Sequence, residues 1–333
     1  MSQQIKNKYG LTRNIPSDVK REVRQNCGFG CVICGLFLYQ YDHVDPSWTE
    51  SKIHDPNAMC LLCPNHHTRK TEKSISLDDI KLACKNPKAK EVSYSRDNEF
   101  YSIKKPNKIR LGNWVFNNPK EILKIGGKIL LALEETEDGT IALTGQFYDR
   151  NSKLILKIDK NEWQPLTGNW DVERVNKKLT IREKDRQISL TVIIEPQNLL
   201  VFDDIKMHYG DIYLVSSGGK KIEIYYKNKL VLQHDPAEEG KGIETDGFLE
   251  ISSDGKLCPI KGRTTIGKGI LTIGNLGRLE SSNHECDIIE LTTKVGRNDP
   301  CPCGAINPAT GEVFKWKKCG MINAPQHRKS LIN

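Results

Sequence analysis

The chain has 333 residues, a formal net charge of +8 and a hydrophobic content of 37%. This length suffices for two or three domains, and no apolar run approaches the roughly 18 residues that a membrane-spanning helix needs. The polar N-terminus, MSQQIKNKYG, lacks the apolar stretch of a signal peptide, so we expect a cytoplasmic protein.

Positive charge is concentrated at both ends of the chain. Residues 1–110 carry a net +7 and residues 294–333 a net +5, which leaves −4 for the residues between them. Basic ends suit a chain that meets a polyanion, although a solvated surface explains the same excess. Most of the eleven cysteines stand in Cys-x-Cys or Cys-x-x-Cys pairs. In a reducing compartment this spacing indicates metal ligation rather than disulfides.

Composition divides the chain into residues 1–110, 111–290 and 291–333. The first part predicts a helix over Asp18–Asn26 that Ser17 caps and Cys27-Gly28 ends. Further expected elements are strands near Cys31–Leu38 and Tyr39–Val44, a helix beginning near Pro64, and a helix over Ser76–Lys85 with Ser76 as its N-cap.

Two pairs of metal-binding residues flank the predicted strands. Cys31-x-x-Cys34 and Cys63-x-x-His66 together supply four nitrogen and sulfur ligands, the set of a structural tetrahedral zinc site. Cys60 offers a competing assignment, because Cys60-x-x-Cys63 has the same spacing. We favour His66, since the turn from Cys63 to His66 leads into a helix and leaves Cys60 in a strand.

A second group of residues between these pairs fits phosphodiester hydrolysis. Such a reaction needs a base for water and a cation on the scissile and leaving oxygens. His43 can be neutral near pH 7 and accept the proton. Asp42 is a hard oxygen ligand for Mg²⁺ or Mn²⁺. His67 follows the expected zinc ligand directly, so it points elsewhere on the helix and is free to hold this second metal.

This segment resembles the HNH endonuclease family, whose pattern is a CxxC, an Asp/His-His-x-x-Pro, an Asn and a CPNCH or CPNHH in a ββα-metal finger. The resemblance covers about residues 20–85 and implies metal-dependent cleavage of nucleic acid, with DNA favoured over RNA and with Mg²⁺, Mn²⁺ or Ni²⁺ as catalytic metal. By resemblance, His43 is the general base, Asp42 and His67 are the catalytic metal ligands, and Asn57 is the middle residue of the motif.

Asn57 departs from the family pattern by one residue. It lies six positions before Cys63, whereas the family's Asn lies about five before the corresponding cysteine. His54 is near enough to take this place, although we expect it on the surface of a strand. Arg69 and Lys70 follow the last histidine and are candidates for phosphate contacts; solvent exposure alone explains them equally well.

The middle part predicts an all-β domain, a sandwich or a barrel, with a smaller β unit after about residue 240. Short β-branched runs are separated by Asp-Gly, Gly-Gly and Asn-Lys turns, which is typical of such folds. The runs are Lys128–Leu133, Thr140–Phe147, Lys153–Ile158, Leu179–Arg182, Ile188–Ile194, Asp211–Val215, Lys221–Tyr226 and Lys229–Gln233. We interpret this domain as one for recognition or assembly, through which the chain could form a homo-oligomer or bind a regulatory partner. The fold class expected for the whole chain is α+β.

The tail carries a second resemblance, to the SEC-C zinc motif. GRNDPCPCG at residues 296–304 is similar to the start of that motif and Trp316-Lys-Lys-Cys319 to its end. The family's fourth ligand would stand where this chain has Gly320, so His327 is the candidate that completes Cys301, Cys303 and Cys319. The resemblance implies zinc binding and protein or nucleic-acid contact, and brings the expected zinc content to about two per chain.

Two functions therefore compete. The favoured one is a DNA endonuclease with a role in restriction or phage defence, since a large β domain beside a nuclease suits a regulated enzyme. The alternative is a zinc-stabilised nucleic-acid-binding protein that does not cut. Asp42, His43 and His67 favour the enzyme, because a zinc clamp alone does not need them.

Overall fold

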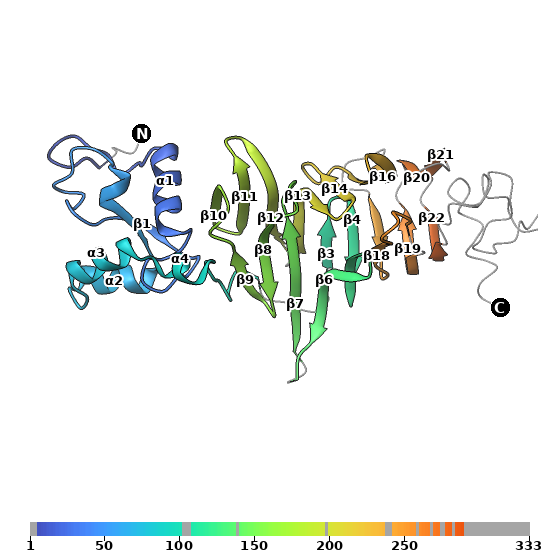
Figure 1. Ribbon diagram of the computed structural model, residues 1–333, viewed down its shortest axis with the longest axis horizontal. Helices are drawn as coiled ribbons and strands as arrows, with labels where there is room; N and C mark the ends of the chain where they lie inside the picture. The colour runs from blue at the N-terminus through green and yellow to red at the C-terminus, as the bar shows by residue number, and fades with distance from the viewer. Residues whose placement is uncertain are drawn as a thin grey trace, which may run out of the picture. The chain divides into compact units, whose positions relative to one another are not determined.

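The structure is a computed structural model that forms two compact units (Figure 1). Unit 1 contains Met1–Phe100 and Ile155–Gln187, and unit 2 contains Tyr101–Leu154 and Ile188–Asn333. The described residues are 5–101, 108–137, 140–196, 199–236, 242–257, 260–266, 269–273, 277–281 and 284–289. The tail expected to hold Cys301, Cys303, Cys319 and His327 lies outside them. The described part is mixed and rich in strands, in agreement with the expected α+β class.

Unit 1 is built from short helices and strand pairs. Its elements are α1 (Ser17–Cys27), β1 (Gln40–His43), the 3-10 helix η1 (Pro56–Ala58), β2 (Met59–Leu62), α2 (Pro64–Thr71), α3 (Leu77–Lys85), α4 (Lys88–Val92), β8 (Leu154–Asp159), β9 (Glu162–Pro165), β10 (Asp171–Val175) and β11 (Lys178–Lys184). Strands β1 and β2 pair antiparallel, with Asp42 opposite Cys60 and His43 opposite Met59.

The helices of unit 1 begin and end for local reasons. α1 starts at Ser17 after Pro16 and has no side-chain cap, so the predicted Ser17 cap is wrong. It ends as predicted, because Gly28 adopts a left-handed φ of 67° that favours glycine. α3 has the predicted Ser76 cap, whose side chain accepts a hydrogen bond from the backbone N–H of Asp79. Buried side chains of α1, β2 and α3, among them Val23, Leu61 and Ile80, share one core.

The strand predicted at Cys31–Leu38 is wrong, whereas the one at Tyr39–Val44 is confirmed as β1. Residues 31–36 form a tight turn: the N–H of Gly35 donates to the carbonyl of Cys31 at 2.8 Å, and the N–H of Cys31 donates to the carbonyl of Leu36 at 2.9 Å. An extended strand would send alternate side chains to opposite faces. The turn instead brings both thiols of the Cys-x-x-Cys pair to one side.

The division into units differs from the expected boundary at residue 110, because residues 155–187 belong to unit 1. The buried guanidinium of Arg24 in α1 donates two hydrogen bonds of 2.8 Å to the carboxylate of Asp171 in β10. It also donates to the hydroxyl of Tyr41 in β1 at 2.7 Å. Arg182 in β11 makes a second ion pair with Asp171 at 2.9 Å. These contacts between distant parts of the sequence tie the β10–β11 hairpin to the N-terminal region.

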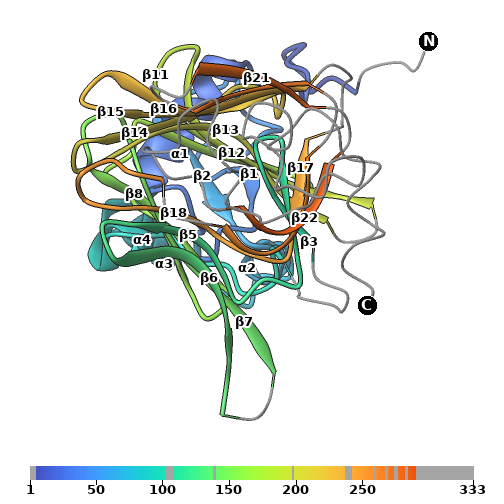
Figure 2. The ribbon, with the colours of Figure 1, turned by 90° about the vertical axis from the view of Figure 1, so that its right-hand side faces the viewer.

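Unit 2 consists of two sheets. Six of the eight predicted runs are strands of this unit, and the other two, Lys153–Ile158 and Leu179–Arg182, are β8 and β11 of unit 1. In one, the order is β21-β20-β16-β15-β14-β13-β3-β4-β17-β19-β22, and β12 also pairs with β13. In the other, β18, β5, β6 and β7 follow one another, and Figure 2 shows β6 and β7 as a long hairpin. Most neighbours are antiparallel, but β13–β3, β17–β4 and β18–β5 are parallel. The strands after residue 240 therefore contribute to both sheets.

The bounds of the unit 2 strands are as follows: β3 (Lys108–Leu111), β4 (Trp114–Asn117), β5 (Glu121–Ile125), β6 (Lys128–Glu135), β7 (Ile141–Tyr148), β12 (Gln187–Glu195), β13 (Leu199–Tyr209), β14 (Ile212–Ser216), β15 (Ile222–Tyr226), β16 (Lys229–Pro236), β17 (Ile243–Thr245), β18 (Leu249–Ile251), β19 (Ile260–Ile266), β20 (Gly269–Ile273), β21 (Gly277–Ser281) and β22 (His284–Ile289). Within the described ranges, the chain has no helix that is both long enough and apolar enough to span a membrane.

Candidate metal centre and active site

Helix α2 starts at a cysteine and carries the histidines of interest on its first turn. Cys63 is its N-cap, and the thiol accepts a hydrogen bond from the backbone N–H of His66 at 3.5 Å. Pro64 occupies the first helical position, where its missing N–H costs nothing and its fixed φ suits the helix. The cap therefore fixes the position of Cys63 and His66 relative to each other, and the predicted helix near Pro64 is confirmed.

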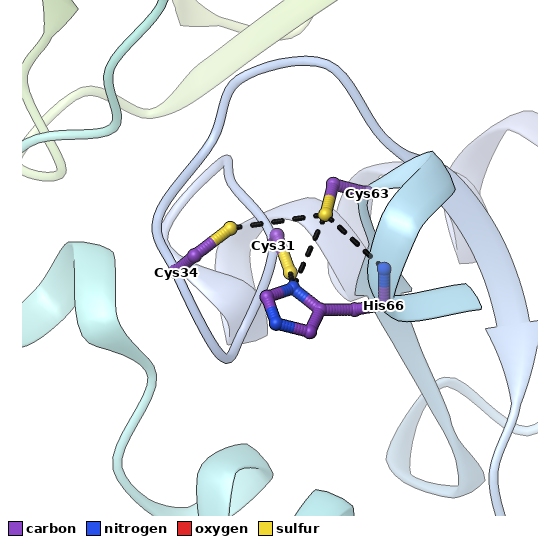
Figure 3. Close-up of side chains that lie close together, drawn as sticks. All are labelled: Cys31, Cys34, Cys63 and His66. Carbon is purple, nitrogen blue, oxygen red and sulfur yellow. Dashed lines mark hydrogen bonds between the residues drawn. The ribbon is translucent and has the colours of Figure 1, made fainter. Parts of the chain in front are cut away.

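Cys31, Cys34, Cys63 and His66 form one compact cluster (Figure 3). The Nδ1 atom of His66 lies 3.2 Å from the Sγ of Cys63 and 3.5 Å from the Sγ of Cys31. The sulfurs of Cys34 and Cys63 are 3.8 Å apart. All four ligand atoms lie within 4.8 Å of one another.

These separations fit a tetrahedral metal site. Two thiolates on one zinc ion with bonds of about 2.3 Å stand about 3.8 Å apart at the tetrahedral angle. The sulfur–sulfur separation of Cys34 and Cys63 matches this value. Three thiols and one imidazole also form a donor set that zinc prefers. The cluster could therefore bind a metal ion, as the sequence predicted for these four residues.

Cys60 lies outside the cluster. It is a fully buried residue of β2, the strand position expected for it. Its thiol forms a hydrogen bond with Cys84 of α3, which lowers the pKa of Cys84. Within the cluster, a hydrogen bond from Cys34 lowers the pKa of the Cys31 thiol. The geometry thus supports His66, not Cys60, as the fourth ligand.

A second pair of possible metal ligands joins β1 to α2. The Oδ1 of Asp42 and the Nε2 of His67 are 3.6 Å apart. Two ligands on one octahedral Mg²⁺ with bonds near 2.1 Å stand about 3 Å apart, a little closer than this pair. Asp42 is 14% exposed and His67 36%, so this pair is open to solvent while the carboxylate stays largely covered.

His43 follows Asp42 on β1 and is only 8% exposed. Its Nε2 lies 3.1 Å from the Nδ1 of His54, a half-buried residue in the loop between the strands. Burial lowers the pKa of His43, and electrostatic interactions with His54, Lys70 and Arg13 lower it further, against an opposing effect of Asp42. The lowered pKa favours the neutral imidazole, the state that a general base requires.

Lys70 makes contacts that the sequence analysis missed. Its ammonium forms an ion pair with the Oδ2 of Asp42 and donates to the backbone carbonyl of His43 at 2.5 Å. This places it on Asp42 of the Asp42–His67 pair, whereas the sequence analysis offered a phosphate contact or solvent exposure for Lys70. Helical spacing was the available signal, because Lys70 stands three residues after His67 and so shares its face of α2.

Asn57 and Arg69 are exposed. Asn57 lies in η1, where its backbone N–H donates to the carboxylate of Asp55, and its side chain makes no hydrogen bond within the described part of the chain. His54, three residues earlier, instead contacts His43. The role of Asn57 stays a prediction, and its one-residue mismatch with the family pattern is the sequence signal that makes His54 the alternative.

Comparison of the chain with protein-family models, with curated proteins and with solved structures gives no significant match.

Proposed function

We propose that this protein is a metal-dependent endonuclease that hydrolyses phosphodiester bonds in DNA with the chemistry of HNH enzymes. The observation that carries the proposal is the placement of the Asp42–His67 pair next to the buried His43, which follows Asp42 on β1. The Cys31, Cys34, Cys63 and His66 cluster, as a zinc site, would hold α2 in position. A closed four-ligand site of this kind is structural, whereas a pair with room for water and substrate suits catalysis.

The residues then divide the reaction among them. His43 accepts the proton of the attacking water, and its contact with His54 fixes the orientation of the ring. Asp42 and His67 would hold Mg²⁺, Mn²⁺ or Ni²⁺, which supplies positive charge for the scissile and leaving oxygens. Lys70 holds the other oxygen of Asp42, so Oδ1 remains directed toward His67.

A plasmid-cleavage assay tests this function. Wild-type protein with Mg²⁺, Mn²⁺ or Ni²⁺ should nick or linearise the plasmid. His43→Ala should lower the rate by about 10²–10⁴-fold, the usual contribution of a general base, at an unchanged zinc content. No cleavage by the wild-type protein with any of the three metals would refute the proposal.

One observation favours a second candidate, a zinc-stabilised nucleic-acid-binding protein that does not cut. The ammonium of Lys70 already supplies a cation to Asp42, and in a non-cleaving protein this ion pair would take the place of the metal. Such a protein would bind DNA, leave the plasmid intact and lose no function in His43→Ala.

A further inference from the structure

An aromatic and basic surface lies next to the proposed active site. It consists of residues 5–13, here called the arm, and residues 44–53, here called the loop. The loop joins His43 directly to His54, the two histidines that contact each other. Any ligand on this surface is therefore close in the chain to the proposed general base.

Specific contacts hold the arm on the loop. The side-chain amide of Asn7 donates to the carbonyls of Trp48 and Ser51 at 2.6 and 2.7 Å. The indole Nε1–H of Trp48 donates to the carbonyl of Thr12 at 3.3 Å. These bonds join segments about forty residues apart in the sequence and give the surface a defined shape.

Cations and aromatic rings alternate across this surface. The guanidinium of Arg13 lies 4.1 Å from the centre of the Trp48 ring. The ring of Tyr9 is 49% exposed, with the ammonium groups of Lys8 and Lys52 at 5.2 and 5.6 Å from its centre. Stacking on a ring holds each cation in place without neutralising its charge.

Two of the cations on this surface, Arg13 and Lys52, are not balanced by acids. Its two carboxylates are engaged, since Glu50 pairs with Lys8 and Asp45 pairs with Lys81. Arg13 and Lys52 have no acidic partner among the residues that the structure describes. Two uncompensated cations, one stacked on the half-buried ring of Trp48 and one beside the exposed ring of Tyr9, are typical of surfaces that bind the backbone of nucleic acids.

We infer that the arm and the loop bind the phosphate backbone of the nucleic-acid substrate beside the scissile bond, with Arg13 and Lys52 as the phosphate contacts. The inference rests on the proposed nuclease function for the identity of the ligand, although the binding can be measured without cleavage. It assigns the substrate contact to the arm and loop, while Lys70 holds Asp42.

The test compares full-length, zinc-loaded proteins in binding to a short labelled duplex and to its single strand, without added divalent metal. Arg13→Gln/Lys52→Gln should raise the Kd for both probes by about tenfold. The slope of log K against log salt between about 50 and 200 mM should fall by about two, one unit for each lost phosphate contact. Lys177→Gln/Lys178→Gln, which removes two exposed charges from the β10–β11 turn of unit 1, is the matched control and should bind as wild type.

A wild-type Kd and slope in Arg13→Gln/Lys52→Gln would overturn the inference, as would an equal loss in the control. Zinc content and the thermal midpoint should match wild type. If Arg13→Gln loosens the loop, Lys52→Gln alone carries the test with half the change in slope. The plasmid assay separates this inference from the proposed function. If the wild-type protein never cuts but Arg13→Gln/Lys52→Gln weakens binding, the binding surface is supported and the nuclease function is refuted. If the wild-type protein cuts but Arg13→Gln/Lys52→Gln binds as wild type, the nuclease function is supported and the binding surface is refuted.

Discussion

His66 and His67 are neighbours on α2, but their imidazoles belong to sites of different chemistry. His66 faces three thiols in a closed cluster, whereas His67 faces one carboxylate at a position open to solvent. Consecutive residues on a helix point about 100° apart, so one turn of α2 can serve both sites. From this difference we expect the cluster of Cys31, Cys34, Cys63 and His66 to determine the stability of the fold, and the Asp42–His67 pair to determine the cleavage activity. The predictions below test this separation.

The largest expected effect is the loss of the cluster. Cys63→Ser removes one ligand and the thiol cap of α2, so we expect loss of the metal and unfolding of the region around residues 17–85. Zinc binding contributes an apparent free energy of about 10–16 kcal/mol to the folding of small zinc domains. Unit 1 has a larger core than such domains, which compensates in part for the loss of the metal. Metal analysis together with circular dichroism and thermal unfolding measures the result. His67→Ala is the control; it should retain the metal and the fold while cleavage is lost. Equal stability of the two variants would contradict the separation.

The ion pairs of Asp171 with Arg24 and Arg182 provide a second test. They stabilise β1, the strand that carries Asp42, without contacting the cluster of Cys31, Cys34, Cys63 and His66. Arg24→Met leaves the buried carboxylate of Asp171 with Arg182 as its remaining cation. Removing one partner from a buried pair costs about 3–5 kcal/mol. Urea unfolding followed by tryptophan fluorescence should show this loss at an unchanged zinc content. Arg21→Met breaks a more exposed pair with Asp185 and should cost at most about 1 kcal/mol.

The sequence predicted the cluster better than its surroundings. Ligand spacing and the Pro64 helix start are local signals, and they were sufficient to identify Cys31, Cys34, Cys63 and His66. The turn at Cys31 was misread as a strand, because its apolar residues satisfy a strand pattern while the thiols require a turn. The Arg24–Asp171 pair spans 147 positions, so no local pattern could assign residues 155–187 to unit 1.

Lys70→Met tests whether Lys70 orients the Asp42–His67 pair. The substitution keeps the length of the side chain but removes the cation on Oδ2 of Asp42 and the bond to the carbonyl of His43. Groups that orient metal ligands typically contribute 10–100-fold to metal affinity or activity. We therefore expect a loss of this size in kcat and in the affinity for Mg²⁺, with little change in KM for DNA. Arg69→Met, an exposed neighbour on the same helix, is the control and should change kcat and Mg²⁺ affinity little. A raised KM with unchanged kcat would instead make Lys70 a phosphate contact.

The smallest effects concern His54 and Asn57, the two candidates for the middle position of the motif. His54→Ala removes the 3.1 Å contact with His43 and should lower kcat by about tenfold, because the base loses the group that fixes the orientation of its ring. Asn57→Ala should have no effect on kcat, since its side chain is exposed and makes no hydrogen bond within the described residues. Steady-state cleavage rates at saturating Mg²⁺ measure both. The reverse order of effects would place Asn57 at the active site in the substrate complex. In that case the proposed active site would reach its final geometry only when substrate binds, whereas the cluster of Cys31, Cys34, Cys63 and His66 already has its final geometry without substrate.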